Sequence, residues 1–130
     1  MESTTNEIWD YSCGDAWIFV VRGDLDVNSS GVLRDALARA DDAGAVALLV
    51  DLEETTFMDP FALGILVGAA KKAQAKQGQL RLVAPSEAAG RLLHVTQMDR
   101  VFPIDPDLIS AYAEVVPAEP PKGSGVDAVA

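Results

Sequence analysis

The chain has 130 residues, and 49% of them are hydrophobic. A chain of this length forms one domain with a buried core, and this composition argues against disorder. The net charge of −10 argues against the phosphate backbone of a nucleic acid as a partner. Cys13 is the single cysteine, which excludes a disulfide or a cysteine-based metal cage within one chain.

The sequence shows neither of the usual membrane signals. No apolar run reaches the ~20 residues that a membrane-spanning helix needs. Residues 1–17 contain acids but no Lys or Arg, whereas a secretory signal needs a basic start and an apolar stretch. We therefore expect a cytoplasmic protein without membrane insertion. Residues 1–59 hold 13 acidic and three basic residues, which hints at a partner with basic patches.

Composition divides the chain into a polar lead-in at 1–12, a domain at 13–116 and a flexible Pro/Gly-rich tail at 117–130. Within the domain, periodicity predicts in chain order strand 16–23, helix 32–44, strand 45–52, helix 60–78, strand 79–84, helix 86–97, strand 101–104 and helix 108–116. Ser29 or Ser30 is a candidate N-cap, and Gly44 and Gly78 are candidate helix stops. The alternation predicts an α/β fold with parallel strands joined by right-handed crossovers.

The stretch TTFMDPFALG, residues 55–64, joins the second predicted strand to the second predicted helix. Asp59 is predicted to cap this helix, because its carboxylate can accept from a free N–H of the first turn and its charge suits the positive helix end. Pro60 suits the first helical position, where no N–H is needed, and it favours an extended backbone at Asp59. Further along, Gly64 and Gly68 are expected to allow close packing of the helix on the sheet.

Three segments occur in a recognisable order: GDLD at 23–26, VDLEETTFMDPFALGILVGAAKKAQAKQGQLRLVAP at 50–85 and RLLHVTQMDRVFPI at 91–104. Together they resemble the STAS domain family, which includes the anti-sigma factor antagonists and domains appended to sulfate transporters. The resemblance covers about residues 14–115. It implies a mixed, mostly parallel sheet of four to five strands, with four helices packed mainly on one side.

The resemblance also singles out the position after Asp59. Regulated antagonists of this family are phosphorylated on the serine that directly follows this Asp. Here Pro60 holds that position, Phe61 holds the next serine position and Ala62 holds a glycine position, whereas Leu63 and Gly64 match the family. Neither Pro60 nor Phe61 can carry a phosphate. The resemblance therefore implies an antagonist without the usual phosphorylatable serine.

The implied partner is an anti-sigma factor with the fold of an ATP-binding serine kinase, through which the protein would affect sigma-factor-dependent transcription. The candidate partner-binding residues are Asp24, Asp26, Thr56, Asp59, Pro60, Phe61, Ala62 and Leu63. Thr55 and Thr56 either substitute as phosphate acceptors or hydrogen-bond the turn. Phe61 either anchors the partner, folds into the core or blocks docking.

Two other functions stay open. STAS domains also serve as structural subunits, as in ABC-type lipid-transport complexes, where the helix beginning at Pro60 would be the docking element. A small-molecule sensor would bind a nucleotide or a lipid at the same end. Monomer and homodimer are both compatible with the sequence.

No catalytic set can be assembled. His94 is the only histidine and lies in a predicted helix, and Glu53 and Glu54 adjoin each other in a predicted turn. A glycine-rich phosphate loop and a metal-ligand cluster are both absent from the sequence. We therefore expect a protein that is not an enzyme and that uses no cofactor or metal.

Overall fold

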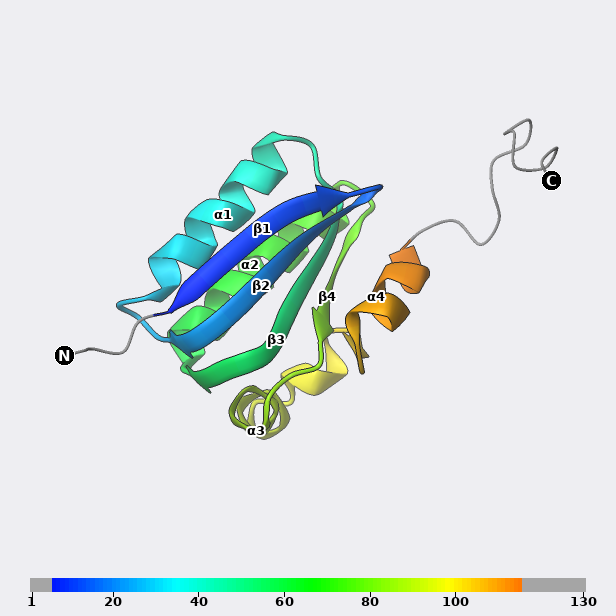
Figure 1. The fold of residues 1–130 in the computed structure, drawn as a ribbon. Coiled ribbons are helices and arrows are strands. Elements are labelled where there is room, and N and C mark those ends of the chain that lie inside the picture. The colour runs from blue at the N-terminus through cyan, green and yellow to red at the C-terminus, as the bar shows by residue number, and fades with distance from the viewer. Residues whose placement is uncertain (1–5, 116–130) are drawn as a thin grey trace, which may run out of the picture.

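The computed structural model describes residues 6–115, which form a five-stranded sheet with four α-helices (Figure 1). In chain order the elements are β1 (Glu7–Cys13), β2 (Ala16–Leu25), α1 (Ser30–Asp42), β3 (Ala47–Met58), α2 (Pro60–Ala75), β4 (Gln79–Val83), α3 (Glu87–Val95), β5 (Ile104–Asp105) and α4 (Leu108–Val115). A short 3-10 helix, Met98–Arg100, lies between α3 and β5. The predicted tail at 117–130 lies outside the described residues.

The strands form one sheet in the order β1-β2-β3-β4-β5. Strand β1 is antiparallel to β2, and all other neighbours are parallel. Each parallel step moves the same way across the sheet, so right-handed crossovers put α1, α2 and α3 on one face. The predicted α/β fold with a mixed, mostly parallel sheet and four helices is confirmed.

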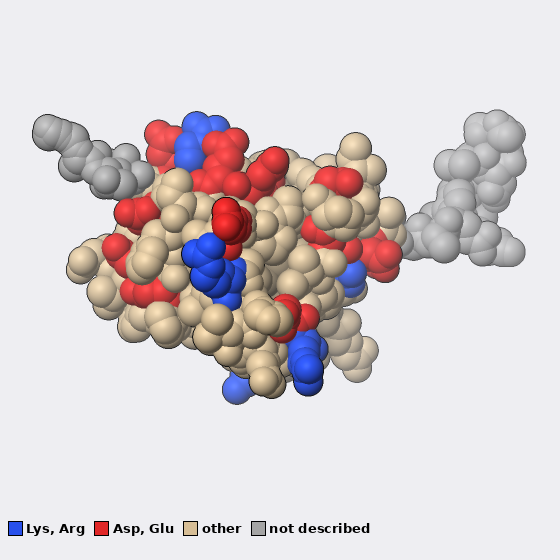
Figure 2. Space-filling model, turned by 90° about the horizontal axis from the view of Figure 1, so that it is seen from below, with Lys and Arg blue, Asp and Glu red and all other residues tan. Residues whose placement is uncertain are grey.

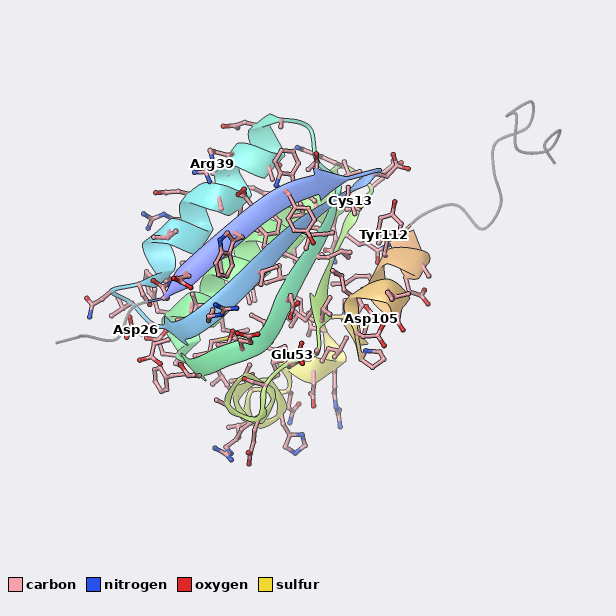
Figure 3. All side chains as sticks on the ribbon, in the orientation of Figure 1. Cys13, Asp26, Arg39, Glu53, Asp105 and Tyr112 are labelled. Atoms are coloured by element: carbon pink, nitrogen blue, oxygen red, sulfur yellow. The ribbon has the colours of Figure 1, made fainter. Side chains whose placement is uncertain are left out.

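The main core lies between the sheet and the helices of that face, and it includes the fully buried Phe19, Leu33 and Leu66. A smaller cluster on the opposite face is covered by α4 through Ala111. Tyr112 of α4 lies beside Cys13 at the turn between β1 and β2 (Figure 3), and desolvation there raises the pKa of Tyr112.

Strand β1 is an element that the sequence analysis missed. Its residues from Glu7 to Ser12 fall in the predicted polar lead-in, yet they pair in register with β2. Ile8 packs against the main core, whereas Trp9 and Tyr11 lie on the other face and are about half exposed. An edge strand that buries only every second side chain on one face keeps a polar composition, which hid it.

Strand β3 is longer than predicted and runs on to Met58. Two register shifts against β2 put extra residues into β3, between its pairings with Val20 and Asp24. Such bulges turn the strand, so that buried side chains recur at Leu52, Thr55 and Met58 instead of at every second position. The predicted turn at Glu53 and Glu54 is therefore wrong, since both lie in the strand.

Ser29 is the N-cap residue of α1 but its side chain makes no cap hydrogen bond, and Ser30 is the first residue of the helix. The C-terminal ends of α1 and α2 follow the predicted glycine signals with one difference. Gly44 has a φ of +89° just after α1, as a glycine stop requires. After α2, the left-handed position is taken by Gln77 with a φ of +66°, and Gly78 follows it. A Cβ at Gly78 would overlap the backbone of Val46, so this glycine is needed for close approach to the start of β3.

The last strand is shorter and later than the predicted 101–104. It is held by an ion pair between Arg81 of β4 and Asp105 of β5, in which Nε lies 2.7 Å from Oδ2 and Nη2 lies 3.1 Å from Oδ1. The two side chains are only 15% and 8% exposed. Hydrogen bonding to Asp105 raises the pKa of Arg81 above its ordinary value.

Candidate protein-binding site

The residues singled out by sequence converge where β2 and β3 end and α2 begins. The Asp59 carboxylate joins the segments: Oδ1 accepts from the Ala62 N–H at 2.9 Å, and Oδ2 accepts from the Val27 N–H at 3.0 Å. The predicted cap of α2 is therefore confirmed, with Pro60 at the first helical position. The second bond, which links the cap to the loop after β2, was not predicted.

Asp26 organises that loop. Its Oδ1 accepts from the N–H groups of Asn28 and Ser29, both at 2.9 Å, and lies 3.0 Å from the Ser29 hydroxyl oxygen, whose single proton it shares with the Asp24 carbonyl. The bonds from Ser29 and Asn28 hold the pKa of Asp26 below its ordinary value, because they favour the ionised carboxylate. Asp26 is thus a structural turn residue whose ionised form is favoured by its hydrogen bonds. Its Oδ2 has no hydrogen-bond partner among the described residues.

Asp24 and Thr56 form a second polar contact across β2 and β3. The Thr56 hydroxyl donates to Asp24 Oδ1 at 2.6 Å, and the Asp24 carbonyl accepts from the Ser29 hydroxyl at 2.8 Å. Asp24 near the end of β2, Asp26 in the loop after β2 and Asp59 at the cap of α2 are therefore three carboxylates that each accept hydrogen bonds at this end of the fold. These hydrogen bonds restrain the carboxylates and give this end of the fold an acidic character.

Three exposed apolar side chains belong to the same segments: Val27 to the loop after β2, Phe57 to the end of β3 and Phe61 to the first turn of α2. Phe61 is 50% exposed, Phe57 is 49% exposed and Val27 is 57% exposed. We call these three residues the apolar rim. The alternative in which Phe61 folds into the core is therefore wrong. Phe57 and Val27 were missed by sequence reasoning, because β3 was expected to end before Phe57.

Two of the candidate contact residues lie beneath the surface. Ala62 is fully buried and Leu63 is 5% exposed, and both belong to the main core. In this conformation they support the start of α2 instead of offering side chains to a partner. Ala62 contributes its backbone N–H to the Asp59 cap.

Charge on the surface is mixed rather than of one sign. Figure 2 shows acidic side chains across one face, interspersed with smaller groups of Lys and Arg. Over residues 6–115 there is no group of three His, Cys, Asp or Glu side chains placed to hold a metal ion. The same residues include no helix with the length and apolarity needed to cross a membrane.

Comparison with known proteins agrees with the fold. A model of the STAS domain matches residues 11–111. The anti-sigma-B factor antagonist of Bacillus subtilis is 33% identical over 84 residues, which cover 65% of this chain and 76% of that protein. The anti-sigma-B factor antagonist of Listeria monocytogenes is 30% identical over 84 residues, covering 65% and 74%. A crystal structure of an anti-sigma factor antagonist from Mycobacterium paratuberculosis has a TM-score of 0.79 at 25% identity, covering 85% of this chain and 94% of that one. The chain belongs to the STAS domain family.

Proposed function

We propose that this protein is an anti-sigma factor antagonist that binds an anti-sigma factor of the ATP-binding kinase type and is not phosphorylated at the start of α2. Binding would sequester the anti-sigma factor and so free a sigma factor for transcription. The similarity to two anti-sigma-B factor antagonists supports the class of partner. The exposed apolar rim and the hydrogen-bonded carboxylates of the same segments support a protein contact at this end.

The proposal that the protein is not phosphorylated at the start of α2 rests on the side chain at position 60. A phosphate at the first turn of a helix adds about −1.5 to −2 charges and can drive a partner away. Pro60 has no hydroxyl, so this change cannot occur on it. The neighbouring Phe61 has none either.

The nearby threonines are poor substitutes. Thr55 is only 2% exposed, so its hydroxyl is out of reach of a kinase active site. Thr56 is exposed, but its hydroxyl is engaged by Asp24 at 2.6 Å. A phosphate on Thr56 would also lie directly beside that carboxylate, where like charges repel. The protein would thus stay permanently in the binding-competent charge state.

The test is isothermal titration calorimetry against the anti-sigma factor encoded by the same genome. We expect Phe61→Ala to weaken binding at least about tenfold, since half-exposed aromatics are typical interface anchors. Ile109→Ala is the matched control, because Ile109 is 83% exposed on α4, on the opposite side of the sheet from α1 and α2. Equal affinities for Phe61→Ala and the unmodified protein would reject the apolar rim as the contact.

Affinity purification from cell extract decides the class of partner. Recovery of a small kinase-fold anti-sigma factor is the expected result. Recovery instead of a membrane-bound ATPase or permease would overturn the proposal in favour of a structural subunit of a transport complex.

A further inference from the structure

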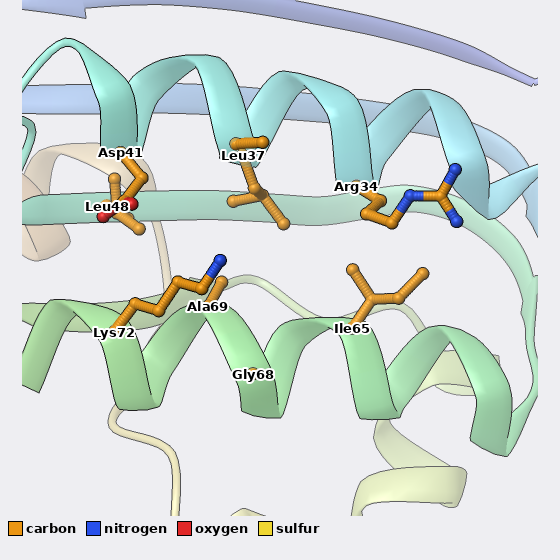
Figure 4. Close-up of a pocket in the computed structure, with 9 residues that line it drawn as sticks. Arg34, Leu37, Asp41, Leu48, Ile65, Gly68, Ala69 and Lys72 are labelled. Carbon is orange, nitrogen blue, oxygen red and sulfur yellow. The ribbon is translucent and has the colours of Figure 1, made fainter.

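A groove lies between α1 and α2, away from the start of α2, with a volume of about 230 Å³ (Figure 4). Its walls are apolar: Leu37 faces it from α1, Ile65 and Ala69 face it from α2, and Leu48 of β3 lies in its floor. Arg34 stands at one end and Lys72 at the other. None of these residues belongs to the candidate protein-binding site.

The groove is open because of a glycine. Gly68 lines it, and a Cβ built at Gly68 would have no atom within 4 Å. The expectation that Gly64 and Gly68 allow close packing on the sheet is therefore wrong, since Gly64 also has no neighbour within 4 Å. Glycine inside a helix is less favourable than alanine. The packing of the described residues therefore gives no reason for a glycine instead of an alanine at position 68.

The charges at the groove leave a positive surplus. Asp41 also lines the groove; its carboxylate lies 2.7 Å from Lys76 Nζ and also interacts with the charge of Lys72. Lys72, whose side chain extends from α2 toward α1, has no carboxylate within 4 Å among residues 6–115 (Figure 4). Within residues 6–115, the one carboxylate within 4 Å of the Arg34 guanidinium is that of the exposed Asp35 on the same helix, at 3.6 Å. Arg34, Lys72 and Asp41 thus leave one net positive charge on the lining of an apolar groove, in a protein whose net charge is −10.

We propose that this groove binds an anionic aliphatic molecule, with a single chain lying against Leu37, Ile65 and Gly68 and the anionic group at Lys72. The volume is below the ~300–1,000 Å³ of sites for drug-sized ligands, which favours one short to medium chain. The cations select an anionic head group over a cationic one. This proposal does not depend on the proposed function, because the two sites share no residue.

The probe is decanoate below its micelle concentration. Its binding is measured by isothermal titration calorimetry and by amide chemical-shift changes in the ¹⁵N-labelled full chain. We expect saturable binding at one site, with shifts centred on α1 and α2. Decylammonium, which has the same chain and the opposite charge, should bind at least about fivefold more weakly. Non-saturable binding, shifts located elsewhere or equal affinities for the two amphiphiles would overturn the proposal.

Two matched pairs of variants locate the site. Gly68→Leu fills the groove and should abolish decanoate binding, whereas Gly64→Leu places the same side chain on the same helix outside the groove and should leave it unchanged. Lys72→Gln should weaken decanoate binding about two- to fivefold, and Lys71→Gln, which changes a cation that does not line the groove, should not. Unchanged binding by Gly68→Leu would refute the assignment.

Discussion

Replacing Asp59 with alanine tests the junction on which the binding surface is built. The substitution removes two acceptors at once, one for the Ala62 N–H at 2.9 Å and one for the Val27 N–H at 3.0 Å. It leaves Pro60 in place, so the backbone preference for a helix start is retained. Any loss of stability then reports on the carboxylate itself.

The two lost bonds set the magnitude. Loss of an N-cap typically costs about 1 kcal/mol. The Val27 N–H is exposed and can hydrogen-bond to water instead, so we take about 1 kcal/mol for its bond to the carboxylate, below the about 1.5–3 kcal/mol of hydrogen bonds to charged groups. We expect Asp59→Ala to lower the free energy of unfolding by about 2 kcal/mol. Asp59→Asn keeps one acceptor oxygen for the cap and should cost about half as much.

Urea unfolding followed by circular dichroism measures this cost. A loss of about 2 kcal/mol lowers the midpoint by roughly 1 M at an unchanged m-value. Asp35→Ala is the control, because it removes an equal charge that makes only a 3.6 Å surface contact, and it should stay within about 0.5 kcal/mol. If Asp59→Ala cost no more than this control, the carboxylate would not be what holds the junction together.

Three further predictions concern the rest of the fold. Gly64→Ala should raise the free energy of unfolding by about 0.5–1 kcal/mol, because the added Cβ meets no other atom. Gly78→Ala should lower it, because the added Cβ would overlap the backbone of Val46. Thermal melts measure both changes, and a change of opposite sign in either variant would contradict the prediction. Asp105→Ala should cost about 3 kcal/mol in urea titrations, since it leaves the mostly buried Arg81 cation unpaired, and a cost below 1 kcal/mol would contradict this. The lowered pKa of Asp26 means that its stabilisation is complete above its ordinary pKa of 3.8 and is lost as the pH falls through the lower folded value. From about pH 5 downward, the free energy of unfolding of the unmodified protein should therefore fall more steeply with pH than that of Asp26→Asn. Parallel curves for the two proteins would contradict this prediction.

Most of the fold was predictable because its helix signals are local. The Asp-Pro start of α2, Gly44 after α1 and the apolar run in the first half of β3 each specify one element through short-range physics. The family resemblance added the sheet composition, which no local signal contains.

The misses have a common cause, which is that they depend on contacts distant in sequence. Strand β1 exists because β2 offers it a partner, and its polar side chains carry no sign of that pairing. The extension of β3 depends on two bulges against β2, which shift burial to Thr55 and expose Phe57. For the same reason the apolar rim and the bond from Val27 to Asp59 could not be inferred from the sequence.

The proposed permanent binding competence depends on the absence of a phosphate acceptor at the start of α2, and one measurement tests this directly. The protein and its Pro60→Ser variant are incubated with the cognate anti-sigma kinase and ATP, and both are analysed by intact-protein and peptide mass spectrometry. We predict that the unmodified sequence keeps its original mass while Pro60→Ser gains one phosphate on the new serine. A phosphate within residues 55–64 of the unmodified protein, above all on Thr56, would contradict the account.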